Sequence, residues 1–83
     1  MSNNVTITVL YFASLAEIVQ RDEEVLTVDS GDLIKIYQDL SDRYGFTLSQ
    51  DELAVAINHH IADWHTPAND GDVIAFIPPV AGG

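Results

Sequence analysis

The chain has 83 residues, of which 47% are apolar and none is cysteine, so it can form one small domain that depends on an apolar core. The absence of cysteine excludes disulfides, thiolate zinc sites and a side-chain sulfur nucleophile. Thirteen acidic residues against three basic ones give a formal charge of −10, which argues against nucleic acid as a partner and favours either a partner with a basic surface or a role in solubility or habitat.

The first residues predict a strand followed by a short helix. Residues 5–12 begin with β-branched residues in a period of two and end in aromatics, which indicates a central strand. Ser14 and Glu17 then have the spacing of a capping box, in which the two side chains satisfy backbone amides at a helix start. The apolar residues that follow at helical spacing are Leu15, Ile18 and Val19.

A second strand and the main helix come next. Residues 24–28 predict a strand with Leu26 and Val28 on one side. Three residues offer an N-cap oxygen before the helix: Asp29, Ser30 and Asp32. The helix should end at Gly45, and its apolar stripe consists of Leu33, Ile36, Tyr37, Leu40 and Tyr44.

The remainder of the chain predicts three strands. Residues 53–58 alternate large and small side chains, and those that should face the core are Leu53, Val55 and Ile57. Residues 60–62 predict a short returning strand. The turn residues 69–72 lead into a last strand over residues 73–77.

The order β-α-β-α-β-β-β predicts an α+β protein with the β-grasp, or ubiquitin-like, fold. We expect a mixed five-stranded sheet packed on one main helix, plus a short helix, as a single domain over residues 1–77. Residues 78–83 should project from it as a C-terminal tail. Because no leader, lipidation signal or apolar run of about eighteen residues is present, we expect a cytoplasmic protein with no membrane partner.

The tail combines two prolines with two glycines. Pro78 and Pro79 favour the extended polyproline conformation at about 3.1 Å per residue, so the tail can carry a terminal carboxylate very roughly 15 to 20 Å from the domain. Gly82 and Gly83 have no Cβ and therefore fit a channel too narrow for side chains. We expect Gly83 to be the reactive residue and Gly82 to give it access to the active site of a partner.

Size alternation in the last strands predicts a docking face. The large residues Ile74 and Phe76 should face the core. The opposite, open face should then hold the partner-binding residues Val73, Ala75, Ile77, Ala54, Ala56 and Ile61, followed by Pro78, Pro79 and Val80. An exposed apolar surface of this kind is typical of a protein interface.

Several short motifs occur together in this chain. Gly71-Asp72 precedes Ala75-Phe76-Ile77-Pro78-Pro79-Val80, and Gly82-Gly83 follows; earlier stand Tyr11-Phe12-Ala13-Ser14-Leu15-Ala16-Glu17 and Ile57-Asn58. This combination resembles the small, sulfur-carrying subunit of molybdopterin synthase over nearly the whole chain. Two positions depart from the family pattern, since Val73 stands where Glu is common and Ala68 where Leu is common.

The resemblance implies a role in molybdenum cofactor biosynthesis. In that family an adenylating activating enzyme uses ATP to join the C-terminal carboxylate to AMP, and a sulfur donor then displaces AMP, which would leave a thiocarboxylate on Gly83. The large synthase subunit binds the tail in a heterotetramer and uses its sulfur to build the dithiolene of molybdopterin. The chain would then be a non-catalytic subunit that binds no cofactor itself, because ATP belongs to the activating partner.

The side chains offer no independent active site. There is no Ser/His/Asp arrangement and no phosphate-binding glycine loop. His59, His60 and His65 have metal-ligand chemistry, but adjacent residues of a strand point to opposite faces, so we predict a solvated hairpin and no metal site. Trp64 is expected to pack in the fold.

Other functions are compatible with the same terminus. In a ubiquitin-like modifier, a lysine attacks the activated glycine and forms an isopeptide bond, and the sequence leaves this alternative open because the attacking group belongs to the partner. Sulfur carriers for thiamin or tRNA thiolation also end in Gly-Gly, although Pro78-Pro79-Val80 resembles the molybdopterin branch better. An interaction module with an inert tail is the third alternative.

Overall fold

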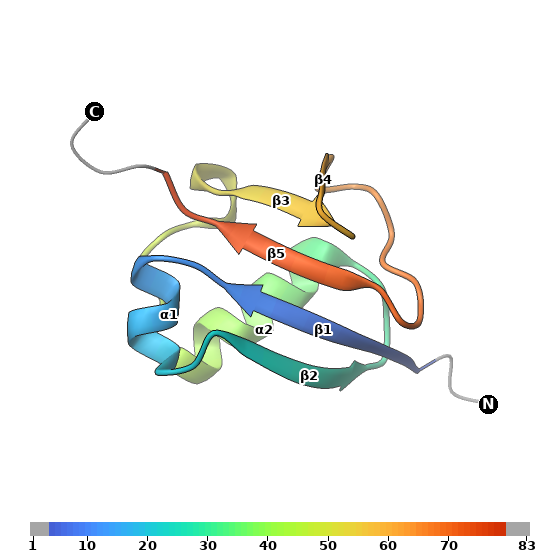
Figure 1. Cartoon of the computed structure of the whole chain (residues 1–83), viewed down its shortest axis with the longest axis horizontal. Helices are drawn as coiled ribbons and strands as arrows, with labels where there is room; N and C mark the ends of the chain where they lie inside the picture. Colours follow the sequence, from blue (N-terminus) through green and yellow to red (C-terminus); the bar gives the residue numbers. More distant parts are fainter. Residues whose placement is uncertain (1–3, 80–83) are drawn as a thin grey trace.

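Five strands form one mixed sheet in the computed structural model, which describes residues 4–79. The strands are β1 (Val5–Tyr11), β2 (Glu23–Val28), β3 (Ala54–Ile57), β4 (His60–Ala62) and β5 (Val73–Ile77). They stand in the order β2-β1-β5-β3-β4, with β1 and β5 parallel and the other neighbouring pairs antiparallel (Figure 1). The predicted element order is confirmed; β1 is an interior strand, and β5 occupies the middle of the sheet.

The main helix, α2 (Leu33–Tyr44), lies across one face of the sheet (Figure 1). The Asp32 carboxylate caps its start by accepting hydrogen bonds from the backbone amides of Ile34 and Lys35 at 3.1 and 3.3 Å. Gly45 ends it in the left-handed conformation, with a φ of 77°. The predicted stripe and its end are therefore confirmed. In the described part of the chain, no helix has the length and apolar character needed to cross a membrane.

The short helix α1 (Ser14–Val19) follows β1, but the predicted capping box at its start is wrong. Ala13 is the N-cap, with φ 50° and ψ −124°, and no side chain bonds to the first amides. Ser14 already lies in the helix, so its hydroxyl is not in the cap position. Ile18 is 39% exposed because so short a helix turns only its other two large apolar residues to the core.

An unpredicted 3-10 turn, η1 (Gln50–Glu52), precedes β3 and contains the capping box that α1 lacks. The Ser49 backbone amide donates to the Glu52 carboxylate at 2.9 Å, and the Ser49 side chain accepts from the Glu52 backbone amide. The same Ser-x-x-Glu spacing therefore occurs twice in the sequence and forms the cap only once.

The core between the sheet and α2 is built on aromatic rings. Phe76 of β5 is fully buried, and the Trp64 ring stacks on it with a centroid distance of 5.7 Å and an interplanar angle of 9°. Trp64 Nε1 donates to the Leu53 carbonyl at 3.1 Å, so this ring is a packing residue, as predicted. Tyr37 of α2 makes edge contacts with both rings at 5.3 and 6.0 Å.

A second cluster joins the end of α2 to β1 and β2. The Tyr11 and Tyr44 hydroxyls donate to the Glu24 carboxylate at 2.8 and 2.9 Å, and Arg21 lies 3.8 Å from the same carboxylate. Burial, together with the hydrogen bond to Glu24, raises the pKa of Tyr11, because a phenolate there would be desolvated beside a carboxylate.

Candidate functional site at the root of the tail

The tail leaves the domain from the middle strand of the sheet. β5 pairs with β1 on one side and with β3 on the other, and its residues Ile74 and Phe76 are completely buried. Pro78 is buried and Pro79 is exposed. The predicted residues Val80, Gly82 and Gly83 lie outside the described residues. The tail is thus rooted in a strand that is hydrogen-bonded on both edges.

Two of the motif residues fix the start of β5. The Asn58 side chain donates to the Asp72 carboxylate at 3.0 Å and accepts from the Val73 backbone amide at 2.9 Å. The second carboxylate oxygen of Asp72 accepts from the Asn69 backbone amide at 2.8 Å. Gly71 supplies the left-handed conformation of the turn, with a φ of 87°. The Gly-Asp and Asn motifs therefore align β5 with β3 and so position the root of the tail.

The side of the sheet opposite to α2, called the outer face below, carries the predicted docking residues. Ala54 pairs with Ile77, and Ala56 pairs with Ala75, across β3 and β5. Ile61 of β4 pairs with Ala56. Because paired residues point to the same side, the predicted assignment of faces is confirmed, and Val73 shares this side by alternation along β5. Contact with a partner stays a prediction.

The residues of the outer face differ in how exposed they are, which corrects the expectation that the whole face is open. Ile61 is 72% exposed, whereas Ala56 and Ala75 are only 5% and 7% exposed, and Pro78 is buried as well. The register explains the two alanines: they lie between Leu10 on β1 and Ile61 on β4, and both flanking side chains are longer. The outer face therefore has a low alanine floor between larger apolar residues.

Two residues near the tail belong to this surface and were not predicted. Leu10 pairs with Ala75 on the outer face, and the alternation of the first strand, which buries Val9 and Tyr11, already indicated its direction. Phe12, directly after β1, is 45% exposed. It lines a hollow of about 520 Å³ at the root of the tail, together with Ala13, Ser14, Glu17, Ile77, Pro78 and Pro79.

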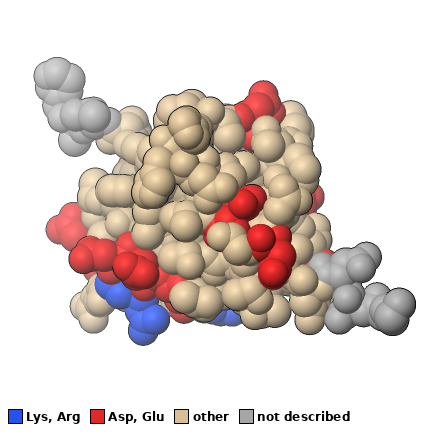
Figure 2. All heavy atoms as spheres, turned by 45° about the vertical axis from the view of Figure 1, so that its right-hand side comes forward, with Lys and Arg blue, Asp and Glu red and all other residues tan. Residues whose placement is uncertain are grey.

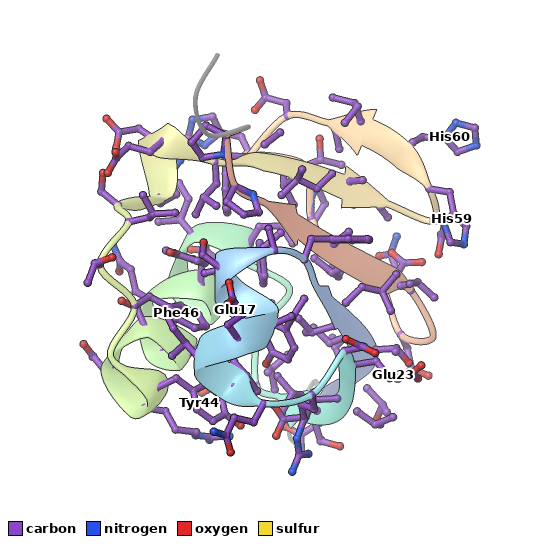
Figure 3. All side chains as sticks on the ribbon, turned by 60° about the vertical axis from the view of Figure 1, so that its left-hand side comes forward. Glu17, Glu23, Tyr44, Phe46, His59 and His60 are labelled. Atoms are coloured by element: carbon purple, nitrogen blue, oxygen red, sulfur yellow. The ribbon has the colours of Figure 1, made fainter. Side chains whose placement is uncertain are left out.

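His59 and His60 lie at the end of the sheet away from the tail, whereas His65 lies in the segment after β4. Figure 3 shows His59 and His60 where β3 connects to β4, away from Glu17 on α1, and His60 is the first residue of β4. Asn58 and His59 have φ angles of 52° and 72° and form the two-residue turn between these strands, so His59 is not a strand residue, as the metal argument had assumed. Within residues 4–79, no three His, Asp or Glu side chains are grouped to hold a metal ion.

The charges are distributed unequally over the surface. Lys35 and Arg43 lie on α2, and Arg21 precedes β2, so all three basic residues are on one side of the molecule. In Figure 2 the visible Lys and Arg atoms lie along the lower edge, next to acidic side chains. Glu17 adds a carboxylate at the root of the tail, where the hollow has no basic lining residue among those described.

Comparison with known protein families agrees with this arrangement of tail and sheet. Residues 9–83 match the model of the ThiS family. The chain belongs to the ThiS family. The match extends from β1 to the last glycine, so it includes both the outer face and the tail of this ThiS-family chain.

A curated relative of this ThiS-family chain is the "Molybdopterin synthase sulfur carrier subunit" of Escherichia coli (strain K12). The two are 35% identical over 80 residues, which is 93% of this chain and 99% of the relative. The resemblance inferred from the motifs is therefore confirmed.

Solved structures support the fold of this ThiS-family chain. A "Protein-protein complex of subunit 1 and 2 of Molybdopterin-converting factor" from Helicobacter pylori 26695 contains a chain that is 31% identical, with a TM-score of 0.64 and coverage of 95% of this chain and 100% of that chain. SAMP1 from Haloferax volcanii is 24% identical, with a TM-score of 0.76 and coverage of 94% and 99%. At that identity the likeness to SAMP1 concerns the fold alone, and it confirms the predicted β-grasp.

Proposed function

We propose that this chain is the sulfur-carrier subunit of a molybdopterin synthase, in the biosynthesis of the molybdenum cofactor. The observation that carries the proposal is the nearly full-length similarity to the Escherichia coli carrier. Two features of the site agree with it: the Pro-Pro segment continues directly from the middle strand, and the apolar outer face surrounds the root of the tail.

The reactive group is the terminal carboxylate of Gly83. On an adenylating partner this carboxylate attacks the α-phosphate of ATP, pyrophosphate leaves, and an acyl adenylate forms. A sulfur donor then attacks the acyl carbon and AMP leaves, so that Gly83 ends as a thiocarboxylate. The tail delivers this sulfur nucleophile, and the large synthase subunit supplies the acid and base groups. The chain itself binds no cofactor in this scheme.

The outer face is the surface that docks on the large subunit. Exposed Ile61 and half-buried Ile77 flank the alanine floor, where a monomeric domain would normally carry charged side chains. A floor of alanines lets the partner approach the sheet closely, and burial of the surrounding large side chains supplies the affinity. The complex of subunits 1 and 2 of the Helicobacter pylori molybdopterin-converting factor supports a partner of this kind.

The hollow beside Pro79 lies at the root of the tail. It can accept an apolar side chain of the partner between Phe12 and Ile77. Glu17 at its border favours a neighbouring basic residue on the partner. The net charge of −10 also favours a basic surface on the partner, because it steers the chain toward positive charge.

Intact-mass spectrometry after co-expression with an activating enzyme and a sulfur source tests the function. We expect one oxygen of the chain to be replaced by one sulfur. Deletion of Gly83 is the matched control: it should prevent the replacement and leave the thermal unfolding temperature unchanged, since this residue lies beyond the paired strands. A lysine adduct would show a modifier instead, and an unchanged mass would contradict the proposal.

A further inference from the structure

A second hollow lies beside the one at the root of the tail and shares Phe12 and Ala13 with it. It has a volume of about 350 Å³, its floor includes Leu10, and it ends at Asp22 and Glu23. Phe12, which is 45% exposed, is therefore a wall of both hollows. An exposed aromatic residue between two hollows is typical of a surface that receives side chains of another protein.

The second hollow is continuous with the outer face. Glu23 pairs with Leu10, Leu10 pairs with Ala75, and Ala75 pairs with Ala56. Ala56 in turn pairs with Ile61. Because paired residues point to the same side of a sheet, these five side chains form one row across all five strands. A partner that docks on the alanine floor therefore meets the hollow at one end of this row.

Negative charge is confined to that end of the outer face. In the strands that the structure describes, Glu23 is the only charged residue that points to the outer face. Asp22 precedes it, and Glu17 on α1 borders the neighbouring hollow (Figure 3). All three residues are exposed, and among residues 4–79 none of their carboxylates takes part in an ion pair. A partner that covered them would have to compensate their charge.

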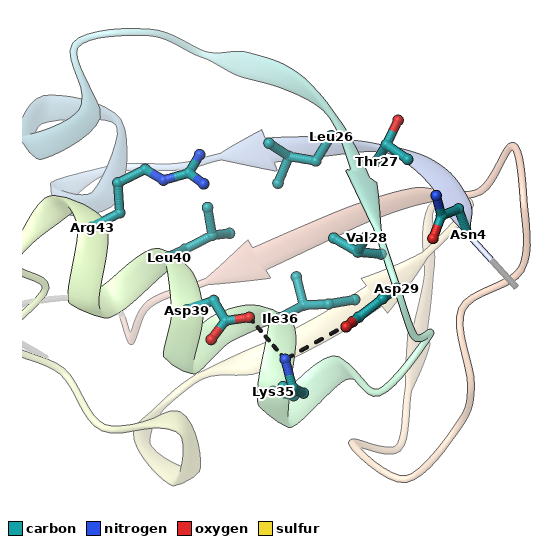
Figure 4. Close-up of a pocket in the computed structure, with 10 residues that line it drawn as sticks. All are labelled: Asn4, Leu26, Thr27, Val28, Asp29, Lys35, Ile36, Asp39, Leu40 and Arg43. Carbon is teal, nitrogen blue, oxygen red and sulfur yellow. Dashed lines mark hydrogen bonds and ion pairs between the residues drawn. The ribbon is translucent and has the colours of Figure 1, made fainter. Parts of the chain in front are cut away.

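The basic residues of this chain lie on the side of α2 and do not neutralise these carboxylates. Arg21 lies 3.8 Å from Glu24, which points to the side of α2. Figure 4 shows Lys35 and Arg43 in a groove of about 370 Å³ between β2 and α2, where Lys35 makes ion pairs with two aspartates. The compensating positive charge must therefore come from the partner.

We propose that the second hollow receives a lysine or arginine side chain of the large synthase subunit. This inference rests on the proposed function and adds the place at which the partner is basic. The aliphatic part of the side chain lies against Leu10 and Phe12, and its cationic end reaches the carboxylates of Asp22 and Glu23. An uncharged apolar side chain would instead leave both carboxylates desolvated and without a partner.

The contact fixes the orientation of the docked partner. The row across the outer face has an apolar end at Ile61 on β4 and an acidic end at Glu23 on β2. An entirely apolar face would accept the partner in several orientations, whereas one charged end selects the orientation that places positive charge over it. The lining of the hollow does not include Val25, so the contact ends at the start of β2.

Calorimetric titration with the large synthase subunit at about 0.1 M NaCl tests the contact. Asp22→Asn with Glu23→Gln should raise the Kd about tenfold. The matched control, Asp39→Asn with Asp42→Asn, removes the same charge from exposed positions of α2 and should change the Kd by less than about twofold. Both variants should keep the thermal unfolding temperature of the parent chain, because exposed charges contribute little to stability.

Equal weakening of the two double variants would mean that only the net charge acts, and it would overturn this inference while leaving the proposed function intact. A parent chain that does not bind the large subunit would contradict the proposed function and, with it, this inference.

A charge exchange identifies the basic residue of the partner. Glu23→Lys should weaken binding by more than about tenfold, because it places two like charges together. Each lysine and arginine on the carrier-binding surface of the large subunit is then replaced by glutamate in turn. One of these replacements should recover at least about fivefold of the affinity lost by Glu23→Lys. If none of them does, no basic side chain of the partner contacts Glu23 and the proposal is wrong.

Discussion

The two faces of this sheet are both apolar, but they are packed in different ways. The inner face carries Ile74 and Phe76, which are fully buried against the rings of Tyr37 and Trp64. The outer face carries alanines at the centre and exposes Ile61 at the edge. Ring contacts on the inner face stabilise the fold, whereas we expect a change at the exposed outer-face residue Ile61 to cost little folding free energy. This difference is the one expected if the outer face is the docking surface proposed above.

Truncation on the inner face should have the largest effect on stability. Phe76→Ala removes a ring that contacts both Tyr37 and Trp64 in the centre of the core. We expect the free energy of unfolding to fall by about 3–5 kcal/mol, because the cavity cannot be filled by neighbouring rings. Urea unfolding monitored by tryptophan fluorescence measures this. A loss under about 1 kcal/mol would contradict the view that the inner face stabilises the fold far more than the outer face.

Alkaline pH should lower the free energy of unfolding, because two tyrosines of the inner face lose their protons only at a cost to the folded state. The pKa of Tyr11 is raised by burial and by Glu24, and burial also raises the pKa of Tyr37. A raised pKa in the folded state means that stability is fully present below the unfolded value of about 10 and is lost as the pH rises beyond it. A group contributes at most about 1.4 kcal/mol per pH unit, and only between its unfolded and its folded pKa.

Tyr11→Phe sharpens this test. The variant should reduce the loss of stability as the pH rises above about 10, because phenylalanine has no proton to lose, while Tyr37 keeps its own contribution. Urea titrations at several pH values measure the slope. An unchanged slope would mean that Tyr11 is not the group that destabilises the fold at high pH.

The smallest effect is expected at Ala13, between the outer face and the tail. Its φ of 50° is unfavourable for a residue with a Cβ. Ala13→Gly should raise the free energy of unfolding by up to about 1 kcal/mol, because glycine adopts this backbone conformation without strain. Thermal unfolding of the variant and the parent chain measures the difference. A destabilised variant would show that the alanine methyl group matters more than the backbone conformation.

Most of the inner face could be predicted from the sequence because local patterns determine it. The stripe of α2 and its end at Gly45 follow from helical spacing and from the conformation that glycine allows. The large-small alternation of the last strand correctly predicted that Ile74 and Phe76 are buried. The turn before β5 was recognisable from its Asn, Asp and Gly residues.

Other features depend on distant partners and could not be predicted in this way. The burial of Ala56 and Ala75 depends on which strands flank them, which only the sheet order reveals. The capping-box spacing at Ser14 and at Ser49 is the same, and tertiary geometry decides that only the second forms a box. The exposure of Phe12 could not be predicted, because an aromatic residue after a strand usually belongs to the core.

Two matched lysine substitutions on the outer face test the docking surface most directly. Ile61 and Val25 are similarly exposed, at 72% and 65%, but lie on opposite edges of the sheet. Both Ile61→Lys and Val25→Lys should change the free energy of unfolding by no more than about 0.5 kcal/mol.

Calorimetric titration of each variant with the large synthase subunit is the decisive measurement. Ile61→Lys should weaken binding by about 2–5 kcal/mol, because docking would bury an unpaired charge, whereas Val25→Lys should bind like the parent chain. If Ile61→Lys bound normally while remaining folded, the outer face would not be the docking surface and the account given for its apolar character would be contradicted.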